Sequence, residues 1–347
     1  MIRTKKDEPL SKQMIRRQNK EPEQKKIFIK PEYVISTGST LLDLAISGTA
    51  IRGGGLIPGI FVEAFGPSGS GKTVLLTEIA GAVQRINGGI MFHDPEARLN
   101  HAFATIFDFD TSKIEVTKPD TVTEVFESIK NWQPTGKINA IFADSLAALS
   151  THLEMENKEG DKMGMRRAKE FSEGLRKTCR ILARENWLMV ASNQIRVNVD
   201  AGPYGEKFNT PGGKAIEFYA SLRLRFKNVE KVRVKHKVGK TEVKRAIGTE
   251  VTVEVVKSSI DKPFRSAQVF IIFDYGIDDI RANLQFIKDH TNATTYTING
   301  EALNPSIEKS IQIVERDKRE KELKEQVIDL WEEIESKFES SRIKKRR

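Results

Sequence analysis

The chain has 347 residues, with 57 Lys or Arg against 48 Asp or Glu and a formal net charge of +9. A hydrophobic fraction of 38% argues against a disordered chain, and no segment approaches the roughly 18 apolar residues of a membrane helix. The basic N-terminus lacks the apolar stretch of a secretory signal, and the single cysteine, Cys179, excludes an intrachain disulfide and a cysteine-based zinc site. We therefore expect a cytoplasmic protein with polyanionic partners and no membrane partner.

The chain begins with a basic segment, because residues 1–30 hold ten Lys or Arg against four Asp or Glu. This composition predicts an arm over about 1–33 that has little core of its own. From about 34 to 276, apolar strands alternate with helical stretches, which is typical of parallel α/β units. Strands are expected at 60–65, 89–94, 139–144 and 187–193, and helices at 73–86, 121–132 and 165–186.

The second half of the sequence predicts an antiparallel extension and a smaller C-terminal domain. Residues 194–213 form a connection too long for a tight turn, and such connections are usually functional or disordered. Three β-rich segments follow, SLRLRFKNV, TEVTVEVVK and SAQVFIIFDYG, whose alternation suits antiparallel pairing. After residue 276 helices dominate, with a solvated helix expected over 315–326. The predicted fold is α/β, with a mostly parallel twisted sheet over 34–276 and a small α/β or helical domain over 277–347.

A glycine-rich motif lies between the first predicted strand of this region and an amphipathic helix. It matches the G-x-x-x-x-G-K-[ST] pattern of a phosphate-binding loop. Glycines let backbone N–H groups surround phosphate oxygens, which the N-terminus of the following helix also attracts. The lysine is expected on the β- and γ-phosphates, and the threonine hydroxyl on Mg²⁺. The motif comprises Gly66, Pro67, Ser68, Gly69, Ser70, Gly71, Lys72 and Thr73.

Three polar side chains at the ends of other predicted strands complete the expected site. Asp144 ends NAIFAD, where a carboxylate orients the Mg²⁺ shell. Glu96, in the segment HDPE, is placed to activate an attacking water, although, taken alone, a capping acid is the simpler interpretation. Gln194 follows WLMVASN and is placed to sense the γ-phosphate and to signal to the loop behind it. His93 is expected to be structural.

Six segments of the region 34–276 occur in a characteristic order: STGSTLLDLAISG, GPSGSGKT, DPEARLN, IFADSLAAL, NQIR and TPGGKAIEFYASLRLRF. Together they resemble the bacterial RecA recombinase. The resemblance implies a phosphate-loop ATPase core of RecA type, an N-terminal polymerisation arm, and ATP with Mg²⁺ as cofactors. It implies that Lys72 and Thr73 bind the nucleotide and its magnesium. It also makes Glu96 the catalytic glutamate, Asp144 the second acidic motif, and Gln194 the residue that couples nucleotide state to DNA binding.

The sequence also differs from the family at three positions of the expected nucleotide site. Phe103 stands where the family has an adenine-stacking tyrosine, and Asn100 where it has an aspartate, so adenine contact is expected in altered form. Lys257 matches one of two lysines that reach the nucleotide of the neighbouring subunit. The second of these lysines is replaced here by Ser259.

Two loops are expected to face DNA by the same resemblance. The first spans about 154–165, where the side chain of Met163 wedges between bases or, alternatively, packs in the core at a helix start. The second spans 195–212, and mobile loops of this kind suit single strands held through their phosphates. The DNA-binding residues expected from the two loops and the following helix are Met163, Gly164, Arg176, Arg196, Phe208, Gly212 and Gly213.

Two further basic segments bear on DNA. Residues 225–245 hold nine Lys or Arg against two acids; this hairpin either takes the second DNA molecule during pairing or presents a solvated face, and both interpretations stay open. The chain ends in RIKKRR, whereas the family usually ends in an acidic tail that restrains DNA binding. We therefore expect weaker self-restraint and a direct contribution of the tail to binding.

Taken together, the sequence predicts an ATP-dependent homologous DNA recombinase. Its subunits would form a helical homo-oligomeric filament on single-stranded DNA, pair with homologous duplex DNA and exchange strands, with hydrolysis releasing the DNA-binding state. One alternative is an ATP-binding accessory protein that coats DNA without strand exchange. The other is a ring-shaped helicase-like ATPase.

Overall fold

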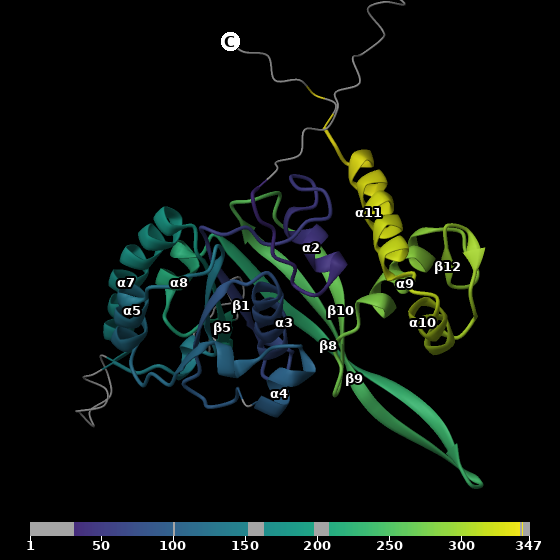
Figure 1. The fold of residues 1–347 in the computed structure, drawn as a ribbon, viewed down its shortest axis with the longest axis horizontal. Coiled ribbons are helices and arrows are strands. Elements are labelled where there is room, and N and C mark those ends of the chain that lie inside the picture. The colour runs from purple at the N-terminus through teal and green to yellow at the C-terminus, as the bar shows by residue number, and fades with distance from the viewer. Residues whose placement is uncertain (1–30, 100, 152–162, 198–207, 341, 343–347) are drawn as a thin grey trace, which may run out of the picture.

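The structure, a computed structural model, describes residues 31–99, 101–151, 163–197, 208–340 and 342. Nine strands form one sheet (Figure 1): β1 (Phe61–Gly66), β2 (Gly89–His93), β3 (Glu115–Thr117), β4 (Asn139–Ala143), β5 (Leu188–Gln194), β8 (Leu222–Val238), β9 (Thr241–Ser258), β10 (Ser266–Ile272) and β11 (Gly276–Ile277). Their order is β11-β10-β9-β8-β1-β5-β4-β2-β3. Two short strands, β6 (Arg196–Val197) and β7 (Phe208–Asn209), pair with each other outside this sheet.

The sheet has a parallel part and an antiparallel part. Strands β8, β1, β5, β4, β2 and β3 pair in parallel, whereas β8, β9, β10 and β11 pair in antiparallel fashion. The central strands β1 and β4 are buried along their whole length, as expected of a parallel sheet covered on both faces. The predicted α/β class, the four parallel strands and the antiparallel extension are confirmed.

Helices cover both faces of the sheet (Figure 1). They are α2 (Thr40–Ser47), α3 (Lys72–Arg85), α4 (His101–Ile106), α5 (Val122–Asn131), α7 (Met163–Glu185) and α8 (Lys214–Tyr219), with the 3-10 helices η1 (Thr111–Lys113) and η2 (Leu146–Ala148). Leu76 of α3 belongs to the core cluster on one face, and Val125 of α5 to the cluster on the other. The predicted helices at 73–86, 121–132 and 165–186 are confirmed as α3, α5 and α7. In such a sheet the ligand site lies at the C-terminal ends of the parallel strands.

Strands β8 and β9 are longer than the sequence indicated, at 17 and 18 residues. They pair from Leu222 and Ser258 in the sheet to Val238 and Thr241 at the tip, with three shifts of register on the way. Their outer half leaves the sheet and extends away from the rest of the molecule as a two-stranded ribbon (Figure 1). The predicted basic hairpin is therefore present, and it is a projecting element rather than part of the sheet surface.

The C-terminal part consists mainly of helices. Its elements are α9 (Asp279–His290), β12 (Thr297–Ile298), β13 (Glu301–Ala302), α10 (Ile307–Arg316) and α11 (Glu320–Lys337). The solvated helix predicted over 315–326 is wrong, because the chain turns at Lys318, whose φ is +54°, and a new helix begins. In addition, α11 buries one side, including Leu323 and Trp331, so it is amphipathic rather than solvated all round. In the described ranges, no helix combines the length and the apolarity that crossing a membrane requires.

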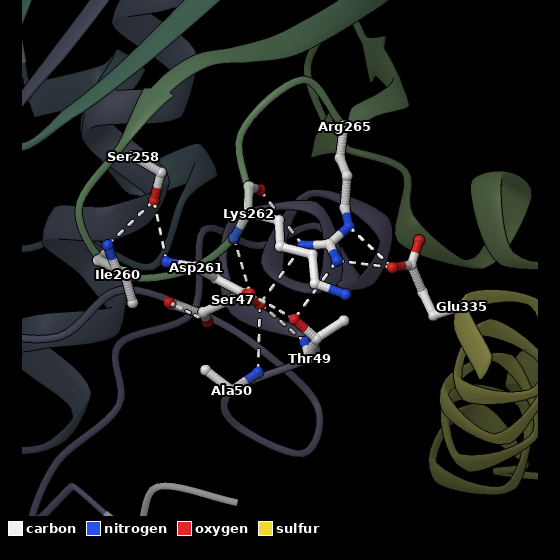
Figure 2. Close-up of polar contacts among 10 residues, drawn as sticks. Ser47, Thr49, Ala50, Ser258, Ile260, Asp261, Lys262, Arg265 and Glu335 are labelled. Atoms are coloured by element: carbon white, nitrogen blue, oxygen red, sulfur yellow. Dashed lines mark hydrogen bonds and ion pairs between the residues drawn. The ribbon is translucent and has the colours of Figure 1, made fainter. Parts of the chain in front are cut away.

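A buried cluster of hydrogen bonds and ion pairs connects α11 with the β9–β10 connection and with the segment after α2 (Figure 2). The carboxylate of Asp261, in the β9–β10 connection, accepts hydrogen bonds from the backbone N–H of Thr49 at 2.9 Å and of Ala50 at 3.2 Å. Arg265 contacts this carboxylate at 3.3 Å and the carboxylate of Glu335 on α11 at 2.6 Å. The side chains of Arg265 and Asp261 are only 9% and 6% exposed, so the C-terminal helix is held by charges largely shielded from solvent. The domain boundary near residue 277 stays a prediction.

Candidate nucleotide-binding site

The glycine-rich motif forms the turn between β1 and α3. The ammonium group of Lys72, the first residue of α3, donates to the carbonyl oxygens of Gly66 at 3.1 Å and of Pro67 at 2.7 Å. Lys72 is only 8% exposed; burial lowers its pKa, and the nearby carboxylate of Asp144 raises it in part. The loop therefore holds a desolvated cation at the N-terminal end of a helix, an arrangement that favours phosphate.

Gly71 shows why the motif requires glycine at its sixth position. Its φ is +90°, which is left-handed backbone that side chains disfavour. A Cβ atom at Gly71 would also lie 2.1 Å from the Cδ1 atom of Ile271, on β10. The close approach brings the antiparallel part of the sheet against the phosphate loop.

Asp144, directly after β4, lies beside the phosphate loop as predicted. Its carboxylate accepts a hydrogen bond from the Thr73 hydroxyl at 2.6 Å and another from the Ser192 hydroxyl. Asp144 is 3% exposed. Hydroxyl and carboxylate oxygens are ligands that Mg²⁺ accepts in nucleotide sites, so the residues present fit the magnesium expected there.

Glu96 lies next to this acid, although on a different segment. One of its carboxylate oxygens accepts from the Ser145 hydroxyl at 2.8 Å, and the other pairs with Arg98. The neighbouring Asp94 accepts instead from two backbone amides, those of Arg98 at 3.0 Å and Leu99 at 2.8 Å. Asp94 therefore caps this turn, and the contacts of Glu96 are with side chains.

A cavity of about 360 Å³ opens between these groups. Gln194 and Phe103, both predicted site residues, line it together with the loop and Asp144. Glu96 does not line it, but its partners Ser145 and Arg98 do. Seven further lining residues could not be predicted from the sequence; among them, Thr249, Ile271 and Phe273 come from the distant antiparallel part of the sheet. The seven are Val74, Arg98, Ser145, Ser192, Thr249, Ile271 and Phe273.

A buried ion pair under the loop was also missed. Glu63 on β1 is fully buried and accepts from the Arg223 guanidinium at 2.6 Å and from the Asn193 amide at 3.0 Å. The same Asn193 amide donates to the carbonyl oxygen of Pro211 at 3.1 Å. Because Asn193 precedes Gln194, this network joins the edge of the cavity to the end of the second predicted DNA loop.

His93 gives a prediction about pH. It is fully buried, and burial lowers its pKa to about 4. The unfolded chain, with a His pKa near 6.5, binds a proton that the folded chain rejects, so stability is lost as pH falls from about 6.5 toward 4. Between pH 7 and pH 5 this loss amounts to about 2 kcal/mol.

The measurement is urea unfolding of the parent and of His93→Gln at both pH values. Asp43, whose pKa burial raises to about 6, acts in the opposite sense, but it is present in both proteins and cancels. We expect the variant to lose less stability on acidification than the parent. Equal losses in the two proteins would refute the assignment.

The ends of the two predicted DNA loops lie side by side. Met163 and Gly164 begin α7, while β6 and β7, which contain Arg196 and Phe208, pair across the second loop. Gly213 lies at the N-terminus of α8, where a Cβ atom would be 3.4 Å from the Cβ of Ala168 on α7. The structure therefore places the helix that follows the second predicted loop against the helix that follows the first.

The remaining predicted residues are placed as follows. Gly212 precedes α8 with a φ of +91°, and Arg176 is exposed on α7. Asn100 lies outside the described residues. Lys257 does not line the cavity of its own chain; its ammonium group donates to the carbonyls of Glu217 and Phe218 at 2.8 and 2.9 Å. Its contact with the nucleotide of a neighbouring subunit stays a prediction.

Comparison with known proteins agrees with this geometry. The family model of the RecA N-terminal domain matches residues 19–278. The chain belongs to the RecA family. It is 36% identical over 247 residues to Protein RecA of Thermus thermophilus, covering 71% of this chain and 69% of that protein. It is 31% identical over 276 residues to Protein RecA of Delftia acidovorans, with shares of 78% and 71%. It is 30% identical over 302 residues to Protein RecA of Deinococcus radiodurans, which covers 85% of this chain and 79% of that protein.

Membership of the RecA family indicates the general activity of this site. RecA-family proteins hydrolyse nucleotide, use magnesium and bind DNA in recombination and repair. The matched residues, 19–278, contain the phosphate loop, Asp144, Glu96 and Gln194.

Proposed function

We propose that this protein is an ATP-dependent homologous DNA recombinase that forms filaments on single-stranded DNA and exchanges strands with a homologous duplex. The observation that carries the proposal is the Asn193 contact. Asn193 donates to Pro211 at the end of the second loop, and its neighbour Gln194 lines the nucleotide cavity. Nucleotide and DNA would thus act on a single short segment, as a switch requires.

The side chains of the site have distinct roles in this proposal. Lys72 holds the β- and γ-phosphates, and Thr73 and Asp144 hold the magnesium ion, which would neutralise charge developing on the transferred phosphate. Glu96, oriented by Ser145, accepts the proton of the attacking water. Phe103, which is half-buried at the cavity wall, offers a ring for the base.

Beyond the cavity, the proposal assigns contacts with DNA and with a second subunit. Gln194 senses the γ-phosphate, and the loop ends at Gly164 and Gly213 position single-stranded DNA. Lys257 reaches the nucleotide of the adjacent subunit in the filament. The segment 1–33 docks on that subunit, and the basic tail 342–347 adds to DNA affinity; residues 1–30 and 343–347 lie outside the described residues.

The test is a strand-exchange assay with circular single-stranded DNA, a homologous linear duplex, ATP and Mg²⁺. The parent and Lys130→Ala, a matched change of an exposed lysine on α5, should both form joint molecules that require homology. Lys72→Ala should form none, because it removes the cation of the phosphate loop.

Two other outcomes would overturn the proposal. ATP-dependent filaments without joint molecules would identify an accessory protein that coats DNA. Closed rings that unwind a forked duplex would identify a helicase-like ATPase.

A further inference from the structure

Arg98 is a cation of the nucleotide cavity that has no role in the function proposed above. Its side chain lines the cavity together with the phosphate loop, although Arg98 lies on a different segment, after β2. Of the described residues that line the cavity, the charged ones are Lys72, Arg98 and Asp144. The cavity therefore has a second positive charge besides that of Lys72, which raises the question of what Arg98 binds.

A tight turn fixes the backbone of Arg98 beside the cavity. The buried carboxylate of Asp94 accepts hydrogen bonds from the backbone N–H groups of Arg98 at 3.0 Å and of Leu99 at 2.8 Å. Ala97, within this turn, has a φ of +51°, and the side chains of Glu96 and Arg98 on either side of it meet. The backbone of Arg98 is thus held in place, and its long side chain is the part that can change partner.

The guanidinium group of Arg98 pairs with the carboxylate that is proposed to activate water. One oxygen of Glu96 accepts from the Ser145 hydroxyl at 2.8 Å, and the other pairs with Arg98. The two donors orient the carboxylate, but they also engage the oxygens through which a general base takes a proton from water. Movement of Arg98 to another anion would free one of these oxygens and leave Glu96 oriented by Ser145.

Such an exchange of partners requires little energy. The Arg98 side chain is 52% exposed, and ion pairs with this degree of exposure contribute little to stability. A guanidinium group binds phosphate through the same fork of N–H groups with which it binds a carboxylate. Burial lowers the pKa of Lys72, and the positive charge of Arg98 adds to this effect, so the two cations act on the same part of the cavity.

We propose that Arg98 recognises the terminal phosphate of a nucleoside triphosphate, and that this contact releases Glu96 to activate water. Arg98 exchanges one anionic partner, the carboxylate of Glu96, for another, the oxygens of the γ-phosphate. A nucleoside diphosphate lacks this phosphate and leaves Arg98 on Glu96. The inference rests on the proposed function, which assigns this cavity to ATP.

Arg98 then has a second effect, on the hydrolysis step itself. In this step the oxygen of the water forms a bond with the γ-phosphorus, and one proton of the water passes to Glu96. The bond between the γ-phosphorus and the bridging oxygen breaks, and ADP leaves with the bonding electrons. An arginine on the γ-phosphate oxygens stabilises the charge of this transition state. When the phosphate has left, Glu96 gives its proton to solvent and Arg98 returns to it.

The test measures equilibrium binding of ATP and of ADP to the full chain, with Mg²⁺ and without DNA. The E96Q variant is the reference, because it lacks the proposed base and ATP survives the measurement. It also separates a direct contact of Arg98 with phosphate from an effect through Glu96. The variants compared with it are E96Q/R98Q, E96Q/R98K and the control E96Q/R184Q. Arg184 is exposed on α7, pairs with the adjacent Glu185 at 2.6 Å and does not line the cavity.

We expect E96Q/R98Q to bind ATP about tenfold more weakly than E96Q, because a hydrogen bond to a charged group is lost. Its affinity for ADP should stay unchanged, which also shows that the cavity is intact. E96Q/R98K keeps the positive charge and should retain most of the affinity for ATP, and E96Q/R184Q should bind both nucleotides like E96Q. With Glu96 present, R98Q should lower the rate of hydrolysis at saturating ATP by about 10²-fold or more.

Three results would overturn this inference alone. Equal affinities of E96Q/R98Q and E96Q for ATP would show that Arg98 acts only through Glu96. Equal losses of affinity for ATP and ADP would show that Arg98 does not distinguish the terminal phosphate. Hydrolysis by R98Q at the rate of the parent would show that Arg98 does not stabilise the transition state.

Failure of the proposed function would give different results. A parent chain that binds neither nucleotide would overturn the assignment of the cavity to ATP, and this inference with it. A parent chain that binds ATP but forms no joint molecules would overturn the recombinase proposal and leave the role of Arg98 standing, because no DNA is present in the binding measurement.

Discussion

Substitution of Glu96 by glutamine should lower the rate of ATP hydrolysis by about 10²–10⁴-fold, the usual contribution of a general base. The carboxylate is oriented by the Ser145 hydroxyl at 2.8 Å and by Arg98. Glutamine keeps the size of the side chain but cannot accept the proton of the attacking water. The measurement is phosphate release in the presence of single-stranded DNA and Mg²⁺.

A matched control and a binding assay separate catalysis from folding. Glu127→Gln makes the same chemical change at an exposed position of α5 and should leave hydrolysis unchanged. Fluorescent nucleotide should bind the E96Q variant as it binds the parent, because Glu96 does not line the cavity. If E96Q hydrolyses ATP at the rate of the parent, another group must activate the water.

Replacement of Glu63 by alanine should cost about 3–5 kcal/mol of unfolding free energy, because it leaves a buried guanidinium without its partner. Glu63 is fully buried and contacts Arg223 at 2.6 Å, and the Arg223 side chain is 10% exposed. Urea unfolding measures the effect. The same variant should uncouple the second predicted DNA loop from nucleotide, since Asn193 loses the acceptor that orients it.

The control for Glu63 uses the other partner of the same arginine. Glu217 contacts Arg223 at 3.0 Å but its side chain is 46% exposed, so Glu217→Ala should cost at most about 1 kcal/mol. The double variant E63L/R223L should recover most of the stability, because an apolar pair replaces the buried ions. Equal effects of E63A and E217A would contradict the prediction.

Site residues could be predicted from the local sequence where they form one contiguous motif or directly follow a predicted strand. The phosphate loop occupies eight successive residues, and Asp144 and Gln194 follow apolar strands whose position is clear from the sequence. Parallel strands place their ends at one edge, so the meeting of these side chains could be predicted. The proximity of Gly213, which follows the second predicted DNA loop, to Ala168, which follows the first, comes from the same topology.

Long-range contacts could not be predicted in the same way. Ile271 and Phe273 reach the cavity only because the antiparallel part of the sheet curves against the loop. Glu63 looks in the sequence like an ordinary polar position of an alternating strand, and only the distant Arg223 explains its burial. The length of the two strands of the ribbon was underestimated, because Lys and Arg on alternate residues do not indicate where a strand leaves its sheet.

The two hydroxyls around Asp144 have a consequence for the choice of ion. A hydroxyl has one proton and two lone pairs, and both Thr73 and Ser192 direct that single proton at the carboxylate. Each hydroxyl oxygen can then offer only its lone pairs to a bound ligand. The two hydroxyl oxygens therefore favour a cation over a ligand that is itself an acceptor. The orientation of the two O–H bonds contributes to this selectivity for cations, together with the negative charge of Asp144.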